Sequence, residues 1–266
     1  MYNKFIYLTL SIFCLIIILP LIGIFSKLNF DLKTILNFIE NKYTLRIIFF
    51  SFYQAFLSAF FSCIIAIPFT LALNRHKDFK IIRIIISLCG FSFVIPSILI
   101  VYGVIKLFGK NGIYNHYFNF YDLIGIETIY GLKAILIAHI LLNAPFATRL
   151  FFQNLNSIPK KYYEVSSSLN LTYFGNIYKL EIPIIIQSIF SVFSIIFTLC
   201  FLSFAIVMTL GGGPLNSTLE VAIYQYALFE LNFSKAIILS FIQIIICLTF
   251  ILIGFYSIKG SNFFEI

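Results

Sequence analysis

Residues 157–183 read SIPKKYYEVSSSLNLTYFGNIYKLEIP and form a long polar passage between two long apolar runs. Within this passage Tyr162, Val165 and Leu169 recur at helical spacing, and Tyr173 continues the series. We expect a short amphipathic helix that either lies in the lipid interface or docks into a groove of a partner protein. Its polar face is rich in Ser and Asn rather than in Lys and Arg, which favours docking.

The composition around this passage is that of a membrane protein. Apolar residues make up 61% of the 266 residues and charged residues only 11%, whereas soluble domains carry about 25% charged residues. A spanning helix needs about 20 mostly apolar residues. We therefore expect an all-α polytopic membrane protein with about six transmembrane helices, at 5–25, 47–73, 84–107, 132–152, 184–209 and 236–257.

An even number of spans places both termini on the same side of the membrane. Four basic residues fall between Arg75 and Arg83, in the shortest loop, and basic loops tend to face the cytoplasm. Over the whole chain the excess is slight, with ten Lys and Arg on that side and eight on the other. We expect cytoplasmic termini, and the expected domains are an N-terminal helix with an external connection (1–46), a transmembrane domain (47–257) and a cytoplasmic tail (258–266).

Several classes of protein do not fit the sequence. The net charge of +8 fits contact with anionic lipid better than nucleic acid, because no basic run interleaved with aromatic residues lies outside the apolar segments. The five cysteines lie inside apolar runs without Cys-x-x-Cys spacing, which argues against a disulfide framework. No Gly-x-x-x-x-Gly-Lys-Ser/Thr loop is present to hold ATP phosphates. We expect no catalytic residue, metal ligand or cofactor, and any power for transport must come from another subunit.

Few polar residues lie deep inside the expected spans. His139 and Asn143 are four residues apart and share a helix face, and Gln54 is isolated in another span. Hydrogen bonding between helices is the ordinary role of such residues. The alternative is that His139, Asn143 and Gln54, together with Gln225, line a substrate path. The scarcity of acidic residues in the spans argues against a proton- or sodium-coupled carrier.

A second distinctive segment follows the fifth expected span. Residues 209–226 read TLGGGPLNSTLEVAIYQY, and the three glycines with Pro214 predict an abrupt helix end. We expect a short helix over 218–228 that re-enters the membrane or lies on the external face. It is either a structural connection or a platform for the substrate or its delivery protein.

The passage 157–183 resembles the cytoplasmic coupling loop of ABC importer permeases. The family pattern is Glu-Ala-Ala, three residues, Gly, nine residues, then Ile-x-Leu-Pro. The spacing is intact here, although two Ala positions and the Gly are replaced. The resemblance implies that an ATPase is coupled through Glu164, Val165, Ser166, Leu169, Asn170, Leu180, Ile182 and Pro183.

Four further stretches resemble the iron(III)/thiamine branch of that family, and most closely the first half of the thiamine permeases. They are 49–59, 130–150, 200–214 and 218–226. This resemblance implies a type-1 (MetI-like) permease core in a bacterial inner membrane. It also implies uptake of thiamine or its (pyro)phosphate with a cytoplasmic ABC ATPase dimer and a periplasmic substrate-binding protein.

The resemblance also implies a second permease half. Thiamine permeases usually carry two six-helix halves in one chain of roughly twice this length, so the second half would come from a separate chain or from a second copy. The alternatives are an iron(III) permease and, from other classes, a channel or a non-transporting membrane assembly subunit. A channel is expected to show a charged or carbonyl-rich pore ring, which the sequence does not indicate.

Overall fold

The computed structural model describes residues 2–25, 32–92, 94–118 and 130–259, and these residues form helices without any strand. Two segments, η1 and η3, are π-helical, and η2 is a short 3-10 turn. In chain order the elements are α1 (Tyr2–Phe25), α2 (Leu32–Ile39), α3 (Lys42–Arg75), α4 (Lys80–Phe91), α5 (Ser97–Phe108), α6 (Ile113–Phe118), α8 (Leu132–Asn156), α9 (Lys160–Ser168), α10 (Tyr173–Asn176), η1 (Ile177–Glu181), α11 (Ile182–Phe201), α12 (Ala205–Leu210), η2 (Pro214–Asn216), α13 (Leu219–Tyr224), η3 (Gln225–Phe229) and α14 (Phe233–Lys259).

The prediction of an all-α membrane protein is confirmed. Four helical stretches of the described residues are long and apolar enough to cross a membrane: α3, α8, α14 and the continuous run Phe174–Phe201, which includes α11. The first expected span falls within α1, a helix of 24 residues. Parts of the expected external connection (26–31) and most of the expected tail (260–266) lie outside the described residues.

Two of the expected spans are not continuous helices. The expected span 84–107 is divided between α4 and α5, and Pro96 is the N-cap of α5. Proline has no backbone N–H and restricts the residue before it, so a helix tends to stop there. The expected span 184–209 is likewise divided, because α11 ends at Phe201 and α12 begins at Ala205. Apolar residues flank both breaks, so hydropathy alone predicts a single helix in each case.

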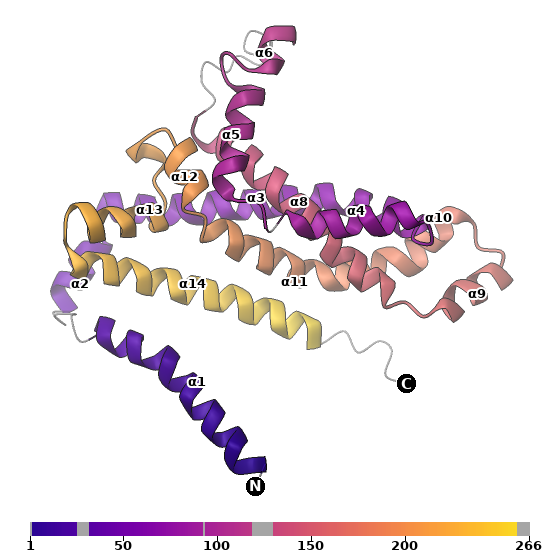
Figure 1. Ribbon diagram of the computed structural model, residues 1–266, viewed down its shortest axis with the longest axis horizontal. Coiled ribbons are helices and arrows are strands. Elements are labelled where there is room, and N and C mark those ends of the chain that lie inside the picture. Colours follow the sequence, from indigo (N-terminus) through magenta and orange to yellow (C-terminus); the bar gives the residue numbers. More distant parts are fainter. Residues whose placement is uncertain (1, 26–31, 93, 119–129, 260–266) are drawn as a thin grey trace.

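The long helices α3, α8, α11 and α14 run side by side along the longest axis of the molecule (Figure 1). Small side chains allow this close approach, as is usual for helices in membranes. Gly254 on α14 is one such position, because a side chain there would approach Ser194 of α11 to 2.9 Å. On α3 the small buried residues recur every three or four positions, as Ser51, Ala55, Ser58, Ser62, Ala66 and Thr70.

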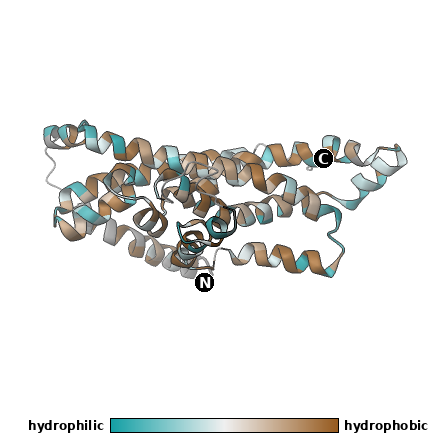
Figure 2. Cartoon of the chain, turned by 90° about the horizontal axis from the view of Figure 1, so that it is seen from above, coloured by the Kyte–Doolittle hydropathy of each residue, from teal (hydrophilic) through white to brown (hydrophobic). Residues whose placement is uncertain are grey.

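The long helices consist mainly of hydrophobic residues, and hydrophilic residues are more frequent toward their ends (Figure 2). This distribution is expected for helices that cross a bilayer. Helix α9 lies at one end of the bundle, and α12 and α13 lie at the other (Figure 1). The turn between α3 and α4 lies at the α9 end, because Lys77 and Glu164 line the same cavity. The loops 74–83 and 157–183, which the sequence assigns to one side of the membrane, are therefore at the same end of the molecule.

Candidate functional site

The amphipathic helix expected within 157–183 is α9. It begins at Lys160 with Pro159 as its N-cap, a place where a missing N–H costs little. It ends at Ser168, so Tyr173 belongs to the next helix, α10, rather than to the same stripe. The helix is therefore shorter than the repeat of apolar residues predicts.

Asn170 explains where α9 stops. Its φ of +52° lies in the left-handed region, which Asn adopts more readily than other residues apart from Gly. The N–H of Asn170 donates to the Ser167 carbonyl and that of Leu171 to the Ser166 carbonyl, both at 3.0 Å. This is the Schellman pattern, which usually has Gly at the left-handed position. Asn170 thus provides the backbone turn that the Gly of the family pattern would provide.

The apolar stripe of α9 faces away from the rest of the protein. The side chains of Val165 and Leu169 are 57% and 68% exposed, and Glu164 is also exposed. Ser166 on the opposite face is buried, and its hydroxyl bonds to Asn176 Oδ1 of α10 at 2.7 Å. Helix α9 is therefore held through Ser166, and its apolar face is exposed.

The last residues of the expected coupling motif begin a spanning helix. Leu180 lies in η1, and Ile182 and Pro183 form the first turn of α11, where proline is well tolerated. Leu180 and Ile182 are only partly exposed, whereas Val165 and Leu169 are exposed. The place of Leu180, Ile182 and Pro183 in the fold is the junction between the polar loop and the membrane.

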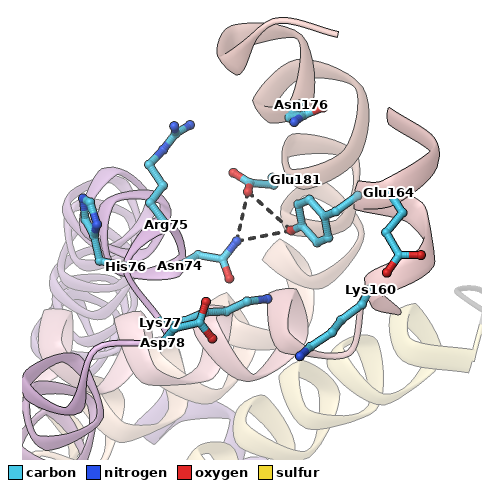
Figure 3. Close-up of a pocket in the computed structure, with 10 residues that line it drawn as sticks. Asn74, Arg75, His76, Lys77, Asp78, Lys160, Glu164, Asn176 and Glu181 are labelled. Atoms are coloured by element: carbon cyan, nitrogen blue, oxygen red, sulfur yellow. Dashed lines mark hydrogen bonds between the residues drawn. The ribbon is translucent and has the colours of Figure 1, made fainter. Parts of the chain in front are cut away.

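A cavity of about 660 Å³ lies between α9, the end of α3 and η1 (Figure 3). Its residues carry both signs of charge, including Lys77, Lys160, Glu164 and the buried Glu181. Glu181 accepts a hydrogen bond from Asn74 at 2.9 Å (Figure 3). Neither residue is indicated by the sequence pattern, in which Glu181 occupies the unspecified position of the Leu-x-Ile-Pro segment.

A second cavity, of about 380 Å³, lies among the spanning helices. His139 and Asn143 both line it, and so do residues at both helix breaks. Ser92 and Ser97 come from the break between α4 and α5, and Ser203 comes from the break between α11 and α12. Broken helices at membrane depth expose polar backbone groups, which are tolerated where they line a cavity.

Hydrogen bonds connect this cavity to the interior of the bundle. The His139 Nδ1 atom lies 2.9 Å from Ser58 Oγ, and His139 Nε2 is buried without a hydrogen-bond partner among the described residues. Asn143 donates to the Cys200 sulfur and Gln54 to the Cys200 carbonyl, each at 3.2 Å. Two of the four expected substrate-path residues, Asn143 and Gln54, therefore meet at Cys200, and His139 lines the same cavity as Asn143.

Gln225, the fourth of these residues, lies elsewhere. It belongs to η3, which with α13 forms the short helical segment expected over 218–228. This segment is packed against the bundle, because the Leu219 side chain is fully buried and its N–H donates to Ser51 Oγ of α3 at 2.7 Å. The start of this segment is buried, and its end is exposed at Leu228 and Phe229.

No protein-family model matches the sequence. The chain is 38% identical over 224 residues to the thiamine transport system permease protein ThiP of Haemophilus influenzae, and 34% identical over 218 residues to ThiP of Escherichia coli. The chain is therefore similar to these permease proteins over about four fifths of its own length. These alignments cover 83% and 81% of the chain but 41% and 40% of the relatives, so the chain spans about two fifths of their length.

Solved structures of ABC importer permeases share the fold. A bacterial ABC transporter for import of the acidic polysaccharide alginate matches with a TM-score of 0.76 and 16% identity, over all of this chain and 96% of that one. The MetNI methionine ABC transporter matches with a TM-score of 0.63 and 18% identity, over 81% of this chain and 94% of that one. The chain is also 27% identical to the probable sulfate transport system permease protein cysT of Helicosporidium. This alignment covers 92% of the chain and 90% of the length of cysT.

Proposed function

We propose that the chain is a permease subunit that carries thiamine or a thiamine phosphate ester across the bacterial inner membrane. ATP hydrolysis on a separate ATPase subunit drives this movement. The observation that carries the proposal is the identity of 34–38% to the ThiP permeases over about four fifths of the chain.

The cavity among the spanning helices is a suitable place for the substrate to pass. Its volume of about 380 Å³ falls within the usual range for small-molecule sites, about 300–1,000 Å³. Thiamine carries a permanent positive charge on its thiazolium ring, and a buried cation in the path would repel it. Among the described residues that line the cavity there is no Lys or Arg, and His139, Asn143 and Ser203 supply polar groups.

Helix α9 is suited to receive the ATPase. Its exposed Val165 and Leu169 form an apolar strip at the end of a membrane domain, with the exposed Glu164 beside it. Amphipathic helices commonly dock by placing such a strip in a groove of the partner. A cytoplasmic ATPase dimer on α9 and a periplasmic binding protein at the other end of the bundle complete the proposed importer.

The α9 end is the cytoplasmic end in this proposal, and both chain termini face the cytoplasm as well. The basic turn between Arg75 and Arg83 lies at this end, in agreement with the tendency of basic loops to remain inside. The exposed apolar side chains of the long helices face lipid and a second permease unit, from another chain or a second copy.

Uptake of radiolabelled substrates tests the assignment. We expect cells that lack this gene to lose thiamine entry, to regain it when the gene is returned, and to take up iron(III) and sulfate normally. Undiminished thiamine entry with loss of iron or sulfate entry would assign the permease to that other substrate. Normal entry of all three would favour a non-transporting assembly subunit and contradict the proposal.

A further inference from the structure

A single buried carboxylate joins three segments that are distant in the sequence. Glu181 is 4% exposed and ends η1, immediately before α11. Its Oε1 atom accepts hydrogen bonds from Asn74 Nδ2 of α3 at 2.9 Å and from the Tyr163 hydroxyl of α9 at 3.4 Å. Asn74 Nδ2 also lies 3.3 Å from the Tyr163 hydroxyl, which closes a triangle of hydrogen bonds (Figure 3). We call these three residues the Glu181 cluster.

The Tyr163 hydroxyl is suited to donate to this carboxylate. Burial is the main cause that raises the pKa of Tyr163, and the nearby Glu181 adds to it, although the hydrogen bond from Asn74 acts in the opposite direction. A phenol has a pKa of about 10 in water, so the raised value keeps the proton on Tyr163 throughout the physiological range. The ammonium of Lys77 lies 5.2 Å from the centre of the Tyr163 ring and packs over it.

The cluster also retains unused hydrogen-bonding capacity. Glu181 Oε2 and Asn74 Oδ1 are buried, and neither has a hydrogen-bond partner among the described residues. Buried polar atoms are usually satisfied, and an exception calls for a reason. Both residues line the cavity of about 660 Å³ beside α9. Spare acceptors next to open space allow Tyr163 and neighbouring donors to exchange partners when α9 shifts, without complete loss of the contact.

The position of Glu181 links a movement of α9 directly to a spanning helix. The residue ends a π-helical turn, a feature frequent at functional sites, and α11 continues from it without a break. Asn74 lies in the last turn of α3, the longest helix. Helices α3 and α11 also pack against one another within the bundle.

We propose that Glu181 is a positioning residue for transport. Through Asn74 and Tyr163 it holds the inner face of α9 to the ends of α3 and α11, so that movement of α9 is passed to both spanning helices. This inference rests on the proposed function, in which an ATPase docks on the outer face of α9.

The test uses the complete importer in proteoliposomes and measures thiamine transported per ATP hydrolysed. We expect Glu181→Ala and Tyr163→Phe to lower this ratio about tenfold, the effect of losing one hydrogen bond to a charged group, while ATP hydrolysis continues. The double variant should be no worse than Glu181→Ala, because both changes remove the same contact. Glu181→Gln, which keeps the accepting oxygen, should restore most of the ratio.

Tyr178→Phe is the matched control. It removes the same hydroxyl group from an exposed residue (76%) of η1, and we expect an unchanged ratio. If the Glu181→Ala protein does not insert into the membrane, the transport ratio of Tyr163→Phe decides the test, since this variant lacks only a single oxygen atom. An unchanged ratio in Tyr163→Phe overturns the proposal, and so does loss of the ATPase from that variant, which would assign the cluster to docking instead.

A second measurement does not depend on the substrate. Addition of a non-hydrolysable ATP analogue should change amide hydrogen exchange at the start of α11 in the wild-type complex but not in Tyr163→Phe. A wild-type complex that shows this change without transporting thiamine would refute the substrate assignment and leave the role of Glu181 supported. The same change in both proteins would refute the role of Glu181 alone.

Discussion

At the scale of single residues, Asn170 shows how a departure from a family pattern can preserve the structure. Its backbone has φ +52°, and β-branched residues fit that conformation poorly. We expect Asn170→Val to destabilise the end of α9 by about 1–2 kcal/mol and Asn170→Gly to leave it intact. The thermal stability of the purified protein and the amount of ATPase that co-purifies check this. Equal behaviour of the two variants would contradict the assigned turn.

Also at this scale, a residue can be recognised from the sequence when its type is unusual for its surroundings. His139 and Asn143 stand out in an apolar run, and both line the membrane cavity. Glu181 does not stand out, because a carboxylate in a polar loop is expected to be solvated. It is buried and accepts a hydrogen bond from Asn74, which lies 107 residues away in the sequence. A contact of that range leaves no local pattern to detect.

At the scale of elements, the exposed face of α9 is the feature open to direct test. We expect Val165→Asp with Leu169→Asp to abolish co-purification of the ATPase, because a buried unpaired charge costs several kcal/mol. Membrane insertion should persist, since both side chains are largely exposed in this chain. Ser167→Asp with Ser168→Asp adds the same charge at exposed positions outside the apolar stripe and serves as the control. An ATPase that remains bound to the Val165/Leu169 variant would show that α9 docks differently or not at all.

Among the elements, the positions of the spans can be predicted from the sequence, whereas the breaks within them cannot. Span positions follow from hydropathy, which depends on composition along the chain, and α3, α8 and α14 lie where the runs predict. The breaks at Pro96 and at 202–204 depend on local backbone geometry and on neighbours that satisfy the freed groups. A proline alone does not specify a break, since Pro68 and Pro145 lie inside continuous helices.

At the scale of the whole molecule, two polar regions lie at different depths of one bundle. The cavity around His139 lies among the spanning helices, and the Glu181 cluster lies where α3 and α11 meet α9. Both involve α11, whose start carries the cluster and whose end forms the break at the cavity. Movement of α11 would therefore alter both regions, which is the connection that an importer powered from one side requires.

The proposed orientation, with α9 in the cytoplasm, can be tested by cysteine labelling. With α9 inside the cell, a cysteine at Ser168 should not react with a membrane-impermeant maleimide added to intact cells, and it should react once the membrane is opened. Leu215, which is 63% exposed in η2 at the α12 and α13 end, provides the matched position for labelling from outside. Both substitutions are made after replacement of the five native cysteines, because Cys14 is exposed. Labelling of Ser168→Cys in intact cells, with Leu215→Cys protected, would reverse the orientation and place α9 where no cytoplasmic ATPase reaches it.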